Sequence, residues 1–226
     1  MFLAAAVLRQ KVLWLVYPVC AALAALAAAA DLSAMLTPGA AGLVLPLGLP
    51  STGLNLRLDA LSSFFGMIVN LGVLTVSIYG LGLDRQHDFS PRIEPFVPLF
   101  AAAMNMVLVA GDAFIFLFSW ELMSLSSWAL VCAKHLDADN RKAGFVYLVM
   151  AAIGTAALLF AFGGLAGTAG GYTFETMRMA TLSPVASALV LAAVLVGAGS
   201  KAGIVPLHAW LPLAHPAAPS HVSALM

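Results

Sequence analysis

Charged residues are what this chain has least of. Asp, Glu, Lys and Arg make up 9% of its 226 residues, whereas hydrophobic residues make up 62%. A soluble domain carries about 25% charged residues, so this chain has too few polar side chains to cover a surface in water. Lipid must be the solvent for most of it, and the composition predicts a membrane protein.

The chain also lacks an excess of charge of either sign, because ten basic and ten acidic residues give a net charge of zero. Nucleic acid is therefore not an expected partner. The two cysteines, Cys20 and Cys132, show neither a disulfide framework nor metal-ligand spacing, and we expect them to be packing residues. We find no haem, flavin or iron–sulfur ligands in the sequence and expect no cofactor in this chain.

Long apolar segments, by contrast, are abundant. Because about 20 mainly apolar residues cross a bilayer, we predict an all-α fold, a polytopic transmembrane helical bundle of about six spans plus the start of a seventh after Pro219. The predicted spans are Val12–Ala30, Asp59–Leu83, Pro95–Ala110, Asp112–Ala133, Ala143–Gly167 and Pro184–Val205.

The connections divide the chain into two parts. Residues 32–57 are rich in proline and glycine, too interrupted to span, and predict a short hairpin or an interfacial segment. We therefore assign residues 1–58 to an N-terminal span with its linker and residues 59–226 to the main membrane domain. Gly111-Asp112 predicts a tight turn, and residues 174–179 predict a short amphipathic turn of helix.

Lysine and arginine are distributed unequally between the two sides that these spans define. One side carries Arg9, Lys11, Arg85, Arg92, Lys134, Arg141 and Lys142. The other side carries only Arg57 and Arg178. The positive-inside rule places the richer side in the cytoplasm. We expect a multi-pass protein of the cell (inner) membrane with a cytoplasmic N-terminus.

Glu121 lies near the middle of the fourth predicted span, in FLFSWELMSLSSW. A carboxylate in hydrocarbon must face the bundle interior, water or a partner cation, and such groups are functional by default. Helical spacing puts Ser124 one turn away on the same face, where its hydroxyl could bond the carboxylate. The alternative is a structural glutamate, either in a buried ion pair or protonated.

Lys201, near the end of the sixth predicted span, is the complementary charge. Small residues such as Gly197, Gly199 and Ser200 surround it and allow close helix approach. Prolines then break the chain at Pro206, Pro212, Pro216 and Pro219. Irregular backbone at membrane depth needs protein or a water-filled cavity around it, so we predict a broken helix after Lys201 where ions or protons are handled. A lysine that extends to the headgroups is the alternative.

Three histidines lie among these prolines: His208, His215 and His221. Histidine titrates in the range that suits a proton relay, and His208 is closest to Lys201, so we select it as a relay member. Their spacing is not a metal signature, and we expect no metal site. For His215 and His221, a hydrogen-bonded histidine in a protein-covered loop is an equal alternative.

Other polar and small residues predict helix packing. The second span carries a stripe at helical spacing, formed by Asp59, Ser63, Gly66, Asn70 and Ser77. Such stripes usually pack against neighbouring helices. Asn105 is expected to hydrogen-bond across helices, and the pair Gly163 and Gly167 to mark a close helix contact.

The segments GSKAGIVPLHAWLPLAHPAAPSHVSALM and SWELMSLSSWALV resemble the proton-conducting, antiporter-like membrane subunits. That family includes the L, M and N subunits of NADH dehydrogenase, the Mrp cation/proton antiporters and membrane-bound hydrogenases. The wording is most similar to its hydrogenase-4 component B and formate hydrogenlyase branch. The resemblance covers the chain from about Leu58 to its end.

The resemblance implies a role for three residues. Glu121 matches the family's intramembrane glutamate, Lys201 the lysine of its broken helix, and His208 the histidine that follows. In the family, association and separation of the Glu–Lys pair are thought to couple proton movement. The implied partners are other membrane subunits of the complex and a peripheral hydrogenase or dehydrogenase module that carries the redox centres. The chain would be a coupling subunit and not the redox catalyst.

The sequence departs from the family pattern in two ways. Leu213 stands where the family usually has an acidic residue before the second histidine. The family also continues with further helices and a second, inverted repeat, so we expect residues 59–226 to be the N-terminal part of a longer domain. Two alternatives remain open: an Mrp-type cation/proton antiporter subunit, and a truncated structural fragment without transport activity.

Overall fold

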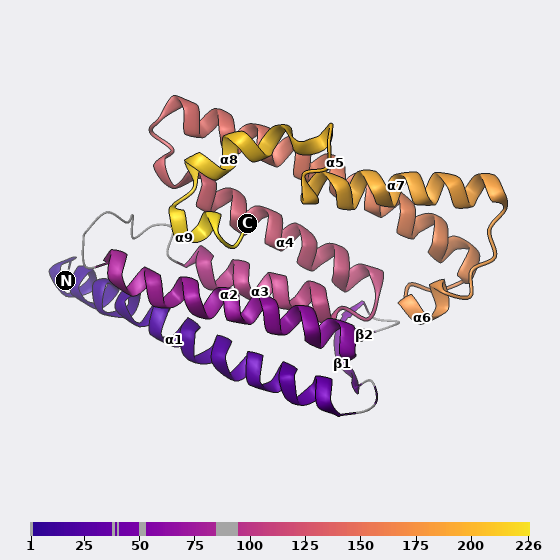
Figure 1. The fold of residues 1–226 in the computed structure, drawn as a ribbon, viewed down its shortest axis with the longest axis horizontal. Coiled ribbons are helices and arrows are strands. Elements are labelled where there is room, and N and C mark those ends of the chain that lie inside the picture. The colour runs from indigo at the N-terminus through magenta and orange to yellow at the C-terminus, as the bar shows by residue number, and fades with distance from the viewer. Residues whose placement is uncertain (1, 38, 40, 50–52, 85–94) are drawn as a thin grey trace.

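The computed structural model describes residues 2–37, 39, 41–49, 53–84 and 95–226. In these residues, long helices lie side by side and a two-stranded hairpin closes one end of the bundle (Figure 1). This confirms the predicted helical membrane bundle. The predicted separation of basic residues between the two sides can be followed only in part, since Arg85 and Arg92 lie outside the described residues, as do the side chains of Arg9 and Lys11.

Five apolar stretches in the described part of the chain are long enough to cross a membrane. They lie in α1 (Phe2–Leu36), α2 (Ala60–Asp84), α4 (Ala113–Val131), α5 (Ala138–Ala169), and α7 (Pro184–Ala202) continued through α8 (Leu211–Ala217). A shorter apolar helix, α3 (Phe96–Val109), lies among them. Each predicted span thus corresponds to a helix.

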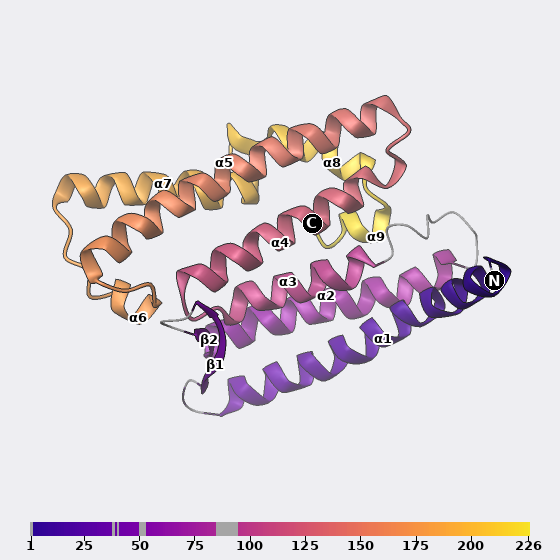
Figure 2. The ribbon, with the colours of Figure 1, turned by 180° about the vertical axis from the view of Figure 1, so that it is seen from behind.

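The helices form three layers. The antiparallel pair α1 and α2 lies on one side, α3 and α4 lie in the middle, and α5 and α7 lie on the other side (Figures 1 and 2). Because α4 packs against both α3 and α5, polar side chains of α4 can reach the outer layer that carries Lys201.

Of the two alternatives predicted for the linker, the structure shows the hairpin, with β1 (Ala41–Leu49) antiparallel to β2 (Gly53–Leu58). Backbone hydrogen bonds connect the hairpin to the neighbouring turns. The Gly111 N–H donates to Asn55 O at 2.9 Å, and the Phe174 N–H donates to Gly111 O at 3.1 Å. The tight turn at Gly111-Asp112 is confirmed, as is the short helix α6 (Phe174–Met177). The hairpin, this turn and the segment before α6 are therefore joined at one end of the bundle.

The predicted break after Lys201 is confirmed. Helix α7 ends at Ala202, and Gly203 follows in the left-handed region with φ +70°. A short 3-10 helix, η2 (Leu207–Trp210), then leads into α8 and into the short helix α9 (Ser220–Ser223). The Trp210 indole N–H donates to Ser200 O at 2.7 Å and so satisfies a carbonyl that the end of α7 leaves without a helical partner.

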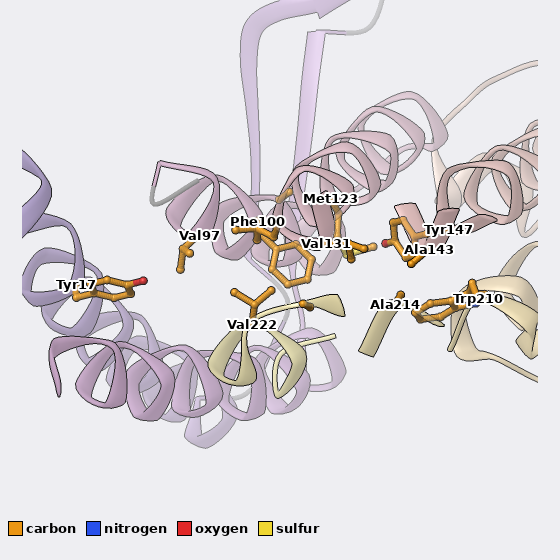
Figure 3. Close-up of a cluster of buried hydrophobic side chains, with 13 residues drawn as sticks. Tyr17, Val97, Phe100, Met123, Val131, Ala143, Tyr147, Trp210, Ala214 and Val222 are labelled. Carbon is orange, nitrogen blue, oxygen red and sulfur yellow. The ribbon is translucent and has the colours of Figure 1, made fainter. Parts of the chain in front are cut away.

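The broken segment is part of the core. Figure 3 shows Trp210, Ala214 and Val222 facing side chains of α3, α4 and α5, and all three are buried. Burial of these apolar groups holds the irregular backbone inside the bundle. Protein therefore covers the inner face of the broken segment, whereas Ile204 and Val205 at the break itself are 55% and 75% exposed.

Small residues bring α5 and α7 together, but not at the predicted pair. No described atom lies within 4 Å of the positions that Cβ atoms would take at Gly163 or Gly167, so the predicted close contact there is wrong. The contact instead involves Gly154, where a Cβ would overlap Ser200 Oγ of α7. Residue size alone marks Gly163, Gly167 and Gly154 equally, and only the crossing point of the helices distinguishes them.

Candidate functional site

Lys201 lies in the last turn of α7 and points into the bundle. Its Nζ donates to Ser124 Oγ of α4 at 3.1 Å and to Tyr147 OH of α5 at 2.9 Å. It also lies 5.9 Å from the ring centre of Trp120 and 5.4 Å from that of Tyr147, within the range of cation–π attraction. Ser124 and Tyr147 are buried. The ammonium group is thus bound at the junction of three helices and does not extend to the headgroups.

Glu121 lies on α4 one turn before Ser124, and its Oε2 accepts a hydrogen bond from Thr155 Oγ1 of α5 at 2.7 Å. The expected bond from Ser124 to this carboxylate is wrong. The Ser124 hydroxyl donates to Trp120 O at 2.9 Å, because a serine inside a helix often bonds the carbonyl four residues earlier. Its oxygen then remains available to accept from Lys201.

The structure brings Glu121 and Lys201 to the same interface without joining them in an ion pair. Among the described residues, the salt bridge present is the one between Arg57 and Asp59, at 3.8 Å between Nε and Oδ2. Lys201 binds Ser124, one turn from Glu121, so hydroxyl groups separate the two charges.

A short chain of hydrogen-bonded hydroxyl groups leads away from Lys201. Tyr147 OH and Ser127 Oγ lie 2.5 Å apart, and the Ser127 hydroxyl also lies 2.7 Å from Met123 O. When Ser127 donates to that carbonyl, the phenol donates to Ser127 and accepts from Lys201.

Sequence reasoning missed Tyr147, Thr155 and Ser127. A signal was available for two of them, since Tyr147 and Thr155 are the only side chains with hydroxyl groups in the apolar span Ala143–Gly167 and share a face at a spacing of eight residues. The sequence does not show which helix that face contacts. The packing of α4, α5 and α7 supplies that information.

His208 does not join this cluster. It lies exposed on η2, and among the described residues no hydrogen bond or ring contact involves its side chain. Pro206 redirects the chain after α7, and the face of η2 that turns inward carries Trp210, which packs edge-on to Tyr147 at 5.1 Å between ring centres.

The other two histidines are hydrogen-bonded within covered segments. His215 Nδ1 lies 2.8 Å from Ser223 Oγ, and its ring stacks on Trp210. His221 is buried, and its Nε2 lies 3.1 Å from Tyr17 OH of α1. This confirms the alternative of bonded, covered histidines for these two positions. The described residues contain no group of three or more His, Cys, Asp or Glu side chains that could hold a metal ion.

The remaining charges of note lie at the hairpin end, outside the spans. The Ser62 backbone N–H donates to Asp59 Oδ1 at 2.9 Å and is the main cause that lowers the pKa of the Asp59 carboxyl below its ordinary value. Asp59 therefore caps the start of α2. Its partly exposed bridge to Arg57, at 3.8 Å, adds little stability.

Together, the bundle and the cluster define a class: a multi-pass membrane protein in which a broken helix presents a half-buried lysine near an intramembrane glutamate. A protein-family model described as NADH:quinone oxidoreductase/Mrp antiporter, TM, matches residues 110–226. The chain belongs to this family. The matched region contains Glu121, Lys201 and the whole broken segment.

Individual relatives agree with this family. The chain is 40% identical over 175 residues to hydrogenase-4 component B of Escherichia coli, covering 76% of this chain and 26% of that protein. It is 29% identical over 184 residues to a putative antiporter subunit mnhA2 of Staphylococcus saprophyticus, covering 80% of this chain and 23% of that protein.

A solved structure shares the fold. The structure of the Mrp complex from Dietzia sp. DQ12-45-1b contains a chain that superposes with a TM-score of 0.79 and 23% identity, covering 99% of this chain and 42% of that one. The chain thus spans about a quarter of the length of the curated relatives it matches and somewhat under half of this structural neighbour.

Proposed function

We propose that this chain is part of a membrane subunit that translocates protons through Glu121 and Lys201, in a complex of the hydrogenase-4, formate hydrogenlyase or NADH dehydrogenase type. One observation carries the proposal. Lys201 Nζ donates to Ser124 and Tyr147 beside Glu121, although 80 residues separate the two charges in sequence. Buried charges placed together in hydrocarbon are expensive, and function is the usual reason for them.

The proposed cycle uses the reach of the lysine side chain. When Lys201 turns from Ser124 towards Glu121, the carboxylate stabilises the ammonium group and a proton is held. When the pair separates, as in this structure, the ammonium depends on the hydroxyls of Ser124 and Tyr147 alone. A proton can then leave Nζ by way of the phenol and water. We assign the exposed His208 to the outer end of this relay, where it exchanges protons beyond the cluster.

An external driver is required, because moving one charge against the membrane potential costs about 2.3 kcal/mol per 100 mV. We propose that electron transfer in a peripheral hydrogenase or dehydrogenase module supplies it, and that other membrane subunits carry the rest of the pathway. The similarity to hydrogenase-4 component B supports this assignment. We place the subunit in the cell (inner) membrane with its N-terminus in the cytoplasm, on the basis of the positive-inside rule.

The test uses the complete protein within its complex, in inverted membrane vesicles. Glu121→Gln and Lys201→Ala should each lower the rate of redox-driven proton uptake about tenfold, since each removes a charged partner from a buried site. Glu175→Gln on α6 and Lys142→Ala at the start of α5 are matched controls, because both side chains are exposed. Wild-type proton uptake in both site variants would refute the proposal.

A subunit of an Mrp-type antiporter is the second candidate, favoured by the fold shared with the Mrp complex. It would use the same Glu–Lys pair without a redox partner. The same vesicles separate the two candidates: an imposed sodium gradient should drive proton movement in an antiporter, whereas addition of an electron donor should drive it in the redox-coupled complex. A structural fragment without transport activity would respond to neither.

A further inference from the structure

The two basic residues on the side of the membrane that carries few positive charges meet at one cavity. Arg57 lies in β2 and Arg178 directly follows α6, and both line a cavity of about 260 Å³ at the hairpin end of the bundle. Two like charges at one cavity repel each other, and an anion bound between them removes that repulsion. The meeting of two arginines so far apart in the chain therefore indicates a ligand with negative charge.

The guanidinium group of Arg57 is not satisfied by the protein around it. Its Nε is covered, and within the described residues it has no hydrogen-bond partner. Asp59 Oδ2 lies 3.8 Å from this Nε, which is too far for a hydrogen bond, while Asp59 Oδ1 accepts the backbone N–H of Ser62. Covered polar atoms are almost always bonded, so this donor remains available to an acceptor in the cavity.

The charges around the cavity favour a ligand with one negative charge. Among the described residues of the wall, Asp59 is the one acid, so the two arginines leave one positive charge without a counterpart. Glu175 lines a neighbouring cavity together with Arg57, but the described residues show no salt bridge between these two side chains. The planar fork of arginine matches the oxygens of a phosphate group, and a phosphodiester carries the one charge required.

The rest of the wall is apolar and continues onto the outside of the bundle. Leu61 and Phe65 of α2 line the cavity and are 67% and 47% exposed on a membrane-spanning helix. The other apolar lining residues are Val107, Leu108, Ala110, Phe116 and Phe174. Cavities that enclose a whole drug-sized ligand have about 300–1,000 Å³, so this smaller one has room for a head group, whereas acyl chains must lie outside it along Leu61 and Phe65.

We propose that this cavity binds the head group of an anionic phospholipid, with the phosphate between Arg57 and Arg178 and the acyl chains along Leu61 and Phe65. Arg57 stands just before Ala60, where the membrane-spanning part of α2 begins, and basic residues at the end of a span lie at the level of the lipid head groups. A soluble anion or an acidic segment of another subunit would leave the apolar wall unused.

This site is built from β2, α2, α3 and α6 and does not depend on the proposed relay. The test is native mass spectrometry of the purified complete complex in a nonionic detergent, titrated with phosphatidylglycerol. Arg57→Gln and Arg178→Gln each remove a charged donor and should raise the lipid concentration for half occupancy about tenfold. At the concentration that fills the site of the wild type, each variant should therefore retain one lipid fewer. Lys142→Gln, exposed at the opposite end of the bundle, is the matched control and should retain the wild-type number.

Phe65→Ser covers the case in which an arginine variant does not fold. It keeps both arginines and removes apolar contact with the acyl chains, and it should weaken binding of phosphatidylglycerol about fivefold. Phosphatidylcholine with the same acyl chains, which has no net charge, should not fill the site, and glycerol phosphate, which has no acyl chains, should not displace the lipid.

Three results would each overturn the proposal. Both arginine variants could retain the wild-type number of phosphatidylglycerol molecules, phosphatidylcholine could fill the site equally well, or glycerol phosphate could displace the lipid, which would make the site one for a soluble phosphate. Loss of another subunit from the complexes of the arginine variants, with wild-type lipid retention, would assign Arg57 and Arg178 to a protein interface instead.

Discussion

At the scale of single residues, the phenol of Tyr147 ties the candidate site together. It accepts from Lys201, contacts Ser127, and packs its ring against Trp210 of the broken segment. The polar and the aromatic parts of one side chain thus bind both the charge and the backbone break. Glu121 and Lys201 could be selected from the sequence because charges are rare in apolar spans, whereas Tyr147 stands out only as one of two hydroxyl side chains in its span.

The phenol hydroxyl can be tested apart from the ring. Tyr147→Phe keeps the edge contact with Trp210 and removes one of the two hydrogen-bond acceptors of Lys201. We expect redox-driven proton uptake in vesicles to fall about tenfold, the effect of losing one hydrogen bond to a charged group, with little change in Tm. Tyr79→Phe is the matched control, since Tyr79 is exposed on α2. Equal rates for the two variants would exclude the phenol from the relay.

At the scale of elements, the sequence predicts where the helices lie but not which helix faces contact one another. Apolar length predicted each long helix, and the prolines predicted the break after α7. The bond from Thr155 to Glu121 and the position of Asp31 depend instead on which faces of α1, α2, α4 and α5 meet. Those contacts arise from packing between segments far apart in the chain, and a single sequence carries little information on them.

The break after α7 depends on a glycine with a left-handed backbone conformation, and this dependence can be tested. Gly203 and Gly170 both have positive φ, at +70° and +74°, so alanine at either should cost about 1 kcal/mol. At Gly203 a Cβ would also overlap Leu211 Cδ1, whereas no described atom lies within 4 Å of a Cβ at Gly170. We expect Gly203→Ala to lower the Tm of the purified complex more than Gly170→Ala. Equal decreases would mean that Leu211 moves away without cost.

At the scale of the whole molecule, described basic residues separate between the two ends of the bundle. Arg57 and Arg178 line one cavity at the hairpin end. Lys134, Arg141 and Lys142 lie at the opposite end, where α4 passes into α5 through the short 3-10 helix η1 (Cys132–Lys134). The order of the spans alone predicts this separation, since each span reverses the direction of the chain.

Labelling of introduced cysteines tests the orientation. In a Cys20→Ala, Cys132→Ala background, Arg178→Cys should react with a membrane-impermeant maleimide added to intact cells, and Lys142→Cys should react only after the membrane is opened. Both positions are exposed, so access to the reagent is limited by the membrane. The reverse pattern would place the N-terminus outside the cytoplasm, contrary to the positive-inside rule.

The joined loops at the hairpin end restrict how this bundle can move. Backbone hydrogen bonds connect Gly111 to Asn55, Phe174 to Gly111, and Ala113 to Tyr172. These bonds join the loops at the ends of α2, α3, α4 and α5. They hold the four helices in fixed axial positions at this end of the bundle. Helix α7, which carries Lys201, is not joined by these bonds. A change in the distance between Glu121 and Lys201 can therefore come from rotation of side chains or from movement of α7 against this fixed end. The hairpin end is therefore the fixed part of the bundle, and relative movement of the helices is expected away from it.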